Sequence, residues 1–172
     1  MKAVNNLVDS HHYVDALERL NEALLIGEFM APVSTFPYEK KQKLYAFKRD
    51  VEKLFVLMNG KDYEEALTLV EDLKKTSRDF STGRAESAIS AAVFASDAYI
   101  AQGQEALAKG DRAKLEECLK KAIEIWPKNP RLLPLRNAMM AAGQQSHALE
   151  DFKRFHKNKN YRRIFDNQHE FA

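Results

Sequence analysis

Hydrophobic positions recur with helical spacing along almost the whole chain. Runs such as Tyr13, Ala16 and Leu20, three or four residues apart, place apolar side chains on one face of a helix. Alternating apolar and polar runs bounded by turn residues, which would indicate β-strands, are nearly absent. The pattern therefore predicts an all-α fold.

Helix-ending residues divide this pattern into seven or eight helices. The chain has only 6 Gly and 5 Pro in 172 residues, which favours long, uninterrupted elements. Asn59-Gly60 and Gly110-Asp111 are typical of helix ends, and two prolines predict a loop at 31–37. The helices are expected at about 12–27, 38–58, 63 to a break at 81–83, 84–109, 112–126, 130–142, 145–157 and 161–167.

Polar residues at the predicted boundaries suggest how the helices begin and end. Asp9 or Ser10 can cap the first helix, and Asn160 the last. Asp62 and Glu65 have the spacing of a capping box, and Gly143 is expected to end the sixth helix. The connections are short, so successive helices should pack antiparallel. Residues 1–172 are expected to form a single domain.

Composition and charge narrow the possible classes of protein. Lys and Arg number 27 against 25 Asp and Glu, so the net charge of +2 implies no strong attraction to nucleic acid or acidic membranes. The single cysteine, Cys118, excludes an internal disulfide and a thiolate metal cluster. No apolar run reaches membrane-spanning length, and no signal peptide is visible. These features favour a soluble, cytoplasmic protein.

One window, 96–129, carries the pattern of a known helical repeat. Aromatic and small core positions on a first helix precede a turn, and large and small positions follow on a second helix that ends at proline. These residues are Tyr99, Gly103, Ala106, Gly110-Asp111, Leu119, Ala122 and Pro127. Their order resembles the tetratricopeptide repeat, a 34-residue pair of antiparallel helices. Leu115, where the family usually has alanine, and Gln102, where it usually has leucine, depart from the pattern.

Other segments resemble the second helix of the same family. They are 60–67, 13–23 and, less closely, 145–152. The resemblance implies a right-handed superhelix of antiparallel helix pairs, here with two unusually long helices at 38–58 and 84–109. Only about nine residues precede the first predicted helix, so its partner helix should be missing or truncated. This suggests that the chain is the C-terminal part of a longer protein.

Reactive constellations are absent from the sequence. The five histidines include no H-x-x-x-H pair, and His11-His12 are adjacent, so they point in different directions on a helix. Adjacent carboxylates such as Glu64-Glu65 diverge in the same way. Cys118, within a predicted helix, is typical of a small buried residue. We expect a protein that is not an enzyme and that holds no cofactor or metal.

The family resemblance implies a binding surface on the first helix of the best repeat. The groove positions are Asp97, Ile100, Gln104 and Leu107. The Lys/Asn/Arg clamp with which some family members hold a peptide C-terminus is not matched. The mixed polarity of these positions suggests a scaffold or adaptor that binds a peptide or helix of a partner protein through apolar anchors.

The C-terminal region leaves two alternatives open. Residues 152–165 hold six Lys/Arg, no acidic residue and four aromatics, a combination that can follow a phosphate backbone and stack bases. The alternative is a capping helix pair in which Phe152, Phe155, Ile164 and Phe165 pack inward. A domain serving only self-assembly or the linkage of other domains is a third hypothesis. The candidate basic surface comprises Lys153, Arg154, Lys157, Lys159, Arg162 and Arg163.

Overall fold

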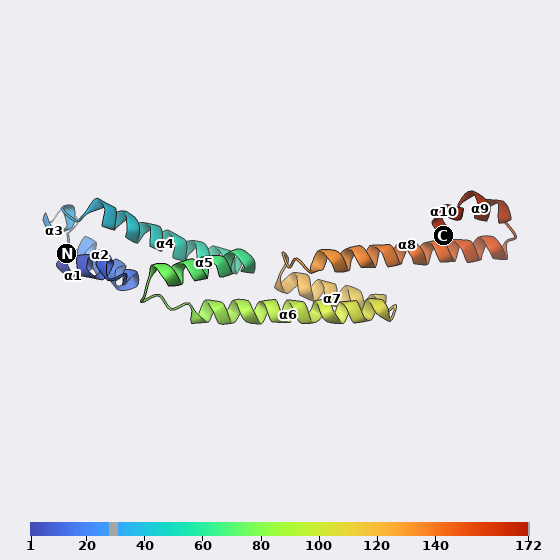
Figure 1. Cartoon of the computed structure of the whole chain (residues 1–172), viewed down its shortest axis with the longest axis horizontal. Coiled ribbons are helices and arrows are strands. Elements are labelled where there is room, and N and C mark those ends of the chain that lie inside the picture. Colours follow the sequence, from blue (N-terminus) through green and yellow to red (C-terminus); the bar gives the residue numbers. More distant parts are fainter. Residues whose placement is uncertain (28–30, 172) are drawn as a thin grey trace. The chain divides into compact units, whose positions relative to one another are not determined.

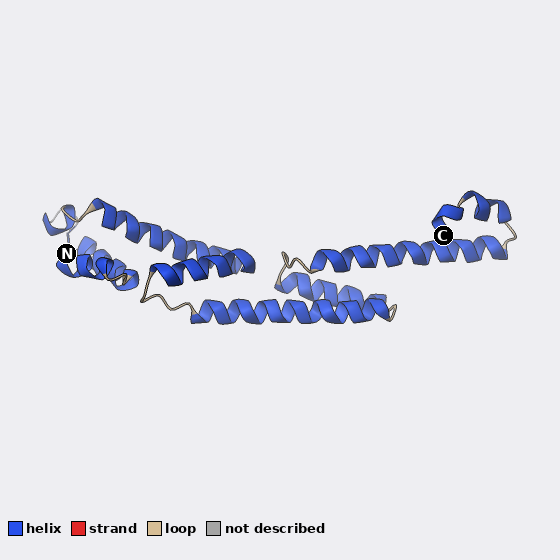
Figure 2. Ribbon diagram, in the orientation of Figure 1, coloured by secondary structure: helices blue, strands red, loops and turns tan. Residues whose placement is uncertain are grey.

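Within the residues that the structure describes, 1–27 and 31–171, every regular element is a helix. Figure 1 colours this computed structural model by position in the sequence, and Figure 2 colours it by secondary structure. The prediction of an all-α fold is confirmed. None of the helices in these ranges combines the length and apolarity that crossing a membrane requires.

The helices are mostly where the hydrophobic pattern predicted them. Those expected at 12–27, 38–58, 84–109 and 112–126 correspond closely to α2, α4, α6 and α7. The full series is α1 (Lys2–Asp9), α2 (Tyr13–Gly27), α3 (Ala31–Ser34), α4 (Tyr38–Asn59), α5 (Tyr63–Thr76), α6 (Gly83–Ala108), α7 (Arg112–Ile125), α8 (Leu132–Lys157), α9 (Tyr161–Asp166) and α10 (Gln168–Phe171).

The prediction of two helices at 130–142 and 145–157 is wrong, because α8 runs through both ranges. Gly143 is buried inside this 26-residue helix and does not end it. A Cβ atom at Gly143 would lie 3.1 Å from Nη2 of Arg112, so this side chain reaches α8 beside the glycine. The segment 145–152 therefore lies inside α8 and does not begin a repeat helix.

A short helix at the N-terminus was not predicted. Val4 and Val8, one helical turn apart, bury the inner face of α1, which packs against α2 and α4. The first repeat helix was expected to have a missing or truncated partner, and the eight-residue α1 is a short partner of this kind. The loop predicted at 31–37 likewise contains one helical turn, α3, because proline is tolerated in the first turn of a helix.

The packing divides into two compact units. The N-terminal unit comprises residues 1–95 and 125–128, and the C-terminal unit comprises 96–124 and 129–172. Each unit has its own hydrophobic core. In the N-terminal unit, Ala16, Leu44 and Ala66 are completely buried, and the Phe47 ring packs edge-on against Tyr13 and Phe80.

Four three-residue turns share one backbone conformation. Their central residues, His11, Lys61, Gly110 and Lys159, are the positive-φ residues of the described chain. In each turn the central N–H donates to a carbonyl three residues back, and the next N–H donates to a carbonyl five residues back. This pair of bonds is the Schellman ending of a helix.

The turns reveal an internal period that the sequence patterns did not predict. Their central residues are 50, 49 and 49 residues apart. Each turn connects a preceding helix to a following one, so a helical hairpin recurs at this spacing. The spacing exceeds the 34 residues of a tetratricopeptide repeat, because α4, α6 and α8 have 22, 26 and 26 residues. The two predicted long helices are confirmed, and α8 is a third.

The start of α2 is capped by a distant segment, contrary to the prediction for Asp9 or Ser10. The Ser10 hydroxyl turns back to carbonyls at the end of α1. The Tyr13 N–H donates to Ser77 Oγ at 3.2 Å, and the Asp15 N–H donates to Asp79 Oδ2 at 2.9 Å. A cap supplied from this distance cannot be recognised in a local sequence pattern.

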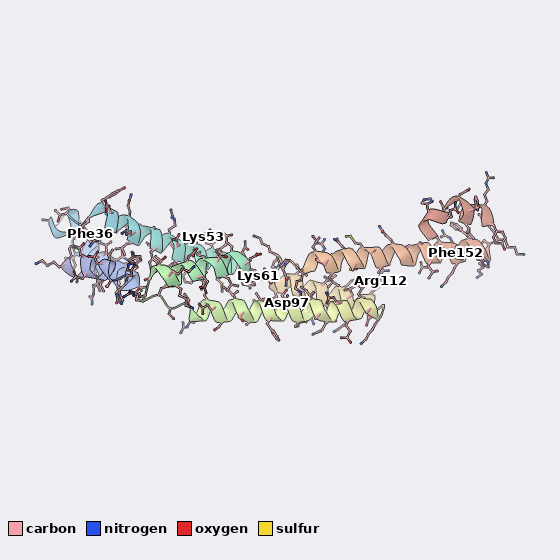
Figure 3. All side chains as sticks on the ribbon, viewed as in Figure 1. Phe36, Lys53, Lys61, Asp97, Arg112 and Phe152 are labelled. Atoms are coloured by element: carbon pink, nitrogen blue, oxygen red, sulfur yellow. The ribbon has the colours of Figure 1, made fainter. Side chains whose placement is uncertain are left out.

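The predicted capping box at α5 is also wrong, because lysines occupy both carboxylates. Asp62 makes no side-chain cap and pairs with Lys128. Glu65 accepts from Lys53 Nζ at 2.7 Å; Lys53 is labelled on α4 in Figure 3. The Asn160 cap is confirmed, since its side chain accepts from the Arg163 N–H at 3.4 Å.

Candidate interaction surface

The four predicted groove residues of α6 differ in accessibility. Ile100 is completely buried in the core of the C-terminal unit. Its assignment to a binding groove is therefore wrong: helices α7 and α8 cover the face of α6 on which it lies. Gln104 is exposed, and Leu107 is half-buried.

The fourth groove residue, Asp97, is held in a polar network. Asn129 is 3% exposed, and its Nδ2 donates to Asp97 Oδ1 and to Ser96 Oγ, both at 2.9 Å. Arg131 Nη1 donates to Asp97 Oδ2, also at 2.9 Å. Hydrogen bonds hold the pKa of Asp97 below its ordinary value, and the bond from Asn129 contributes more than the bond from Arg131. Partial burial opposes this lowering. The network joins α6 to the segment between α7 and α8; Asp97 is labelled in Figure 3.

Gly103 lies where helices of the C-terminal unit cross closely. A Cβ atom at this position would lie 3.4 Å from Leu115 Cδ1 and 3.5 Å from Cys118 Cβ, both on α7. It would also lie 3.0 Å from Leu135 Cδ2 on α8. The prediction that Gly103 is a small position at a helix crossing is confirmed by this geometry.

A cavity of about 150 Å³ opens beside the turn between α6 and α7. Its walls bring together three helices: Leu107 comes from α6, Leu115 from α7, and Met139 and Ala142 from α8. The turn and the first residue of α7 complete the lining with Gly110, Asp111 and Arg112. Leu107 is thus the predicted groove residue that borders a hollow.

Arg112 lines this cavity as an exposed side chain with no acidic partner among the described residues. Its guanidinium lies against α8 at Gly143, as the 3.1 Å approach to a Cβ at that position indicates. The neighbouring Asp111 is used locally, because its Oδ1 accepts from the Lys114 N–H at 3.0 Å and caps α7. Arg112 is labelled in Figure 3. Sequence reasoning missed it, because a lone arginine at a helix start carries no motif.

The six residues of the candidate basic surface are all exposed. Two of them pair with acids that flank the basic stretch: Arg154 with Asp151 at 2.5 Å, and Arg162 with Asp166 at 4.0 Å. Arg163 lies over the Phe155 ring, 5.7 Å from its centroid. The remaining lysines are Lys153, Lys157 and Lys159.

The aromatic residues beside this surface do not all pack inward. Phe152, Phe155 and Ile164 are partly buried, as a capping helix pair requires. Phe165 is 72% exposed, so its predicted inward packing is wrong, and Tyr161 is 58% exposed. The helix α9 has six residues and no buried position, which is too little surface to cover both rings.

Large apolar side chains are also exposed on the three long helices. Phe55 and Val56 on α4 are 66% and 69% exposed, and Phe94 on α6 is 77% exposed. On α8, Leu133 and Met140 are seven residues apart, and both are 62% exposed. A seven-residue separation places two side chains on the same face of a helix.

The cysteine and a histidine singled out in the sequence lie in local packing or hydrogen-bonding environments. Cys118 is a free, buried thiol, as predicted, and its Cβ would lie 3.5 Å from a Cβ atom at Gly103. His12 Nδ1 lies 2.9 Å from Ser10 Oγ in the first turn. Within the described ranges, no group of three or more His, Cys, Asp or Glu side chains is arranged to hold a metal ion.

Comparison with known proteins identifies no relative: no family model, no curated protein and no solved structure matches this chain.

Proposed function

We propose that this protein is an interaction scaffold that binds a segment of a partner protein on the exposed faces of its long helices. The proposal is supported above all by the exposed apolar side chains on α4, α6 and α8. Such residues are usually scattered singly on a soluble surface. Here Leu133 shares a helix face with Met140, and both are 62% exposed. Apolar anchors at helical spacing suit a partner helix or an extended peptide.

Recurring helical hairpins add a second argument. Three of the four hairpins contain one long helix, α4, α6 or α8, and a hydrogen-bonded Schellman turn joins it to the next helix. A rigid helical surface binds a partner with little loss of conformational entropy on the scaffold side. The tetratricopeptide resemblance points to the same class of function, as an analogy of repeat architecture.

The test is affinity capture from native cell extract, comparing the wild-type chain with a Leu133→Gln, Met140→Gln variant. Both positions are exposed, so helical circular dichroism should not change. A matched control carries two glutamine substitutions on the exposed side of α7, Glu116→Gln and Lys120→Gln. A partner that is retained by the control and lost by the α8 variant supports the proposal. Equal capture by all three chains contradicts binding on this face.

A second candidate function is the binding of single-stranded nucleic acid by the C-terminal basic surface. The specific observation in its favour is the exposure of Tyr161 and Phe165 beside Lys157, Lys159 and Arg163. Exposed rings can stack on bases while neighbouring cations contact phosphates. Binding of a labelled oligonucleotide should then weaken steeply as salt rises, through counterion release. Affinity that does not change with salt, or a Tyr161→Ser, Phe165→Ser variant that binds as well, removes this candidate.

A further inference from the structure

The cavity beside the turn between α6 and α7 combines an apolar interior with one cation, Arg112, that has no acidic partner among the described residues. Leu107, Leu115, Met139 and Ala142 supply the interior, which measures about 150 Å³. An apolar cavity of about this volume accepts a ring the size of benzene. One aliphatic or aromatic side chain of a partner therefore fits, and a whole cofactor does not.

Charge at the rim selects between possible occupants. The other cations near this turn are already paired: Lys109 with Glu105 at 2.6 Å, and Lys114 with Glu117 at 3.5 Å. Arg112 is exposed and has no such partner among the described residues, and its Nη2 lies near Gly143 of α8. The Asp111 carboxylate in the same lining accepts from the Lys114 N–H and caps α7. The unpaired guanidinium at the rim therefore favours an occupant that carries a carboxylate.

We propose that this cavity binds an acidic peptide of a partner protein, with one apolar side chain in the cavity and a neighbouring Asp or Glu carboxylate on Arg112. This inference rests on the proposed scaffold function and gives the partner segment a chemistry. Burial of the apolar side chain supplies most of the affinity. The ion pair supplies selectivity, because an exposed pair is worth up to about 1 kcal/mol, or about fivefold in affinity.

The experiment is a selection of displayed random peptides on the full chain, followed by affinity measurements on the selected peptides. Three variants are compared with the wild type. Arg112→Gln removes the cation, Ala142→Leu fills the cavity, and Lys120→Gln makes the same charge change elsewhere on α7. Circular dichroism confirms that each variant is folded.

Selected peptides should carry Asp or Glu close to an aliphatic or aromatic residue. Arg112→Gln should weaken them about fivefold and Ala142→Leu about tenfold or more, whereas Lys120→Gln should leave affinity unchanged. Replacing the peptide's acid by its amide should cost about fivefold with the wild type and nothing with Arg112→Gln, because the pair is already broken.

Two outcomes overturn the inference. Peptides with equal affinity for Ala142→Leu and for the wild type do not use the cavity. Peptides for which the acid-to-amide change costs the same in wild type and in Arg112→Gln do not pair with the guanidinium. Either outcome leaves the scaffold function standing, because that function fails separately, when the α8 variant captures the same partners as the wild type.

Discussion

At the scale of single residues, the four central turn residues adopt the same left-handed conformation with different side chains. Gly110 has φ +72°, whereas His11, Lys61 and Lys159 hold φ between 52° and 61°. A residue with a Cβ pays roughly 1 kcal/mol for this region. The hydrogen bonds of the turn must offset that cost in three of the four turns.

Gly110→Ala should destabilise the C-terminal unit by about 1 kcal/mol. No heavy atom lies within 4 Å of the new Cβ, so the cost comes from the backbone conformation alone. Gly83→Ala is the matched control: it also has open space but no positive φ, and it should stabilise α6 by about 0.5 to 1 kcal/mol. Urea unfolding measures both, and equal effects of the two substitutions would contradict the argument.

Lys159→Gly should have the opposite effect to Gly110→Ala. Glycine removes the strain of φ 52° in the turn before α9, which should stabilise this turn by about 0.5 to 1 kcal/mol. Amide hydrogen exchange at the end of α8 and in α9 reports this local stability. Faster exchange in the variant would mean that the lysine side chain stabilises the turn more than glycine relieves it.

At the scale of helices, the ends and crossings depend on contacts that are distant in sequence. Burial alone would raise the pKa of Asp79, but hydrogen bonds from the Asp15 N–H, the Ser77 hydroxyl and the Val14 N–H lower it below its ordinary value. The carboxylate also lies at the N-terminus of α2, where the helix dipole favours negative charge. One acidic residue thus ties the start of α2 to the segment after α5.

Asp79→Ala should cost the N-terminal unit about 1 kcal/mol at neutral pH. Because the pKa is lower in the folded state, the contribution is complete above the unfolded value of about 3.9 and is lost as pH falls through the folded pKa. Urea unfolding at pH 7 and at progressively lower pH should therefore show the wild type and the variant converging in acid. A constant difference between them across this range would rule out the ionised cap.

The crossing at Gly103 makes a prediction that opposes helix propensity. Alanine is intrinsically better than glycine in a helix by about 1 kcal/mol. At Gly103, however, the new methyl group would be 3.0 Å from Leu135 and 3.4 Å from Leu115. Gly103→Ala should destabilise the C-terminal unit by about 1 to 3 kcal/mol in urea unfolding. A stabilised variant would show that α6, α7 and α8 separate more readily than their packing implies.

At the scale of the whole molecule, the hairpins repeat every 49 to 50 residues, but equivalent positions in them carry side chains of different size. The position five residues after the central residue of a turn is buried in the first three hairpins. It is occupied by Ala16, Ala66 and Leu115. Two hairpins therefore close tightly on alanine, and the third accommodates leucine. In the third hairpin the larger Leu115 faces Gly103 on α6, where a Cβ would lie 3.4 Å from Leu115 Cδ1, and it also borders the cavity.

Ala66→Leu and Leu115→Ala exchange the side chains found at this position in two hairpins. Both substitutions should destabilise the folded protein. Leucine at Ala66 overpacks a completely buried site, at a cost of about 1 to 3 kcal/mol. Alanine at Leu115 removes buried methyl groups and enlarges the cavity, at a cost of about 2 to 5 kcal/mol. Urea unfolding of the two variants tests this, and a neutral Ala66→Leu would mean that the hairpins close with similar spacing.

The local sequence pattern determined where the helices of this protein form. Tertiary contacts decided which of their residues are buried, capped or paired. The spacing of apolar residues predicted α2, α4, α6 and α7, because helix formation depends on neighbours three and four positions away. The same pattern could not distinguish Ile100, which other helices cover, from Leu107, which borders a cavity. It misjudged Gly143, which lies inside α8, and Asp62, whose carboxylate pairs with Lys128. Burial, distant caps and ion pairs join residues far apart in the chain, and only the folded structure brings them together.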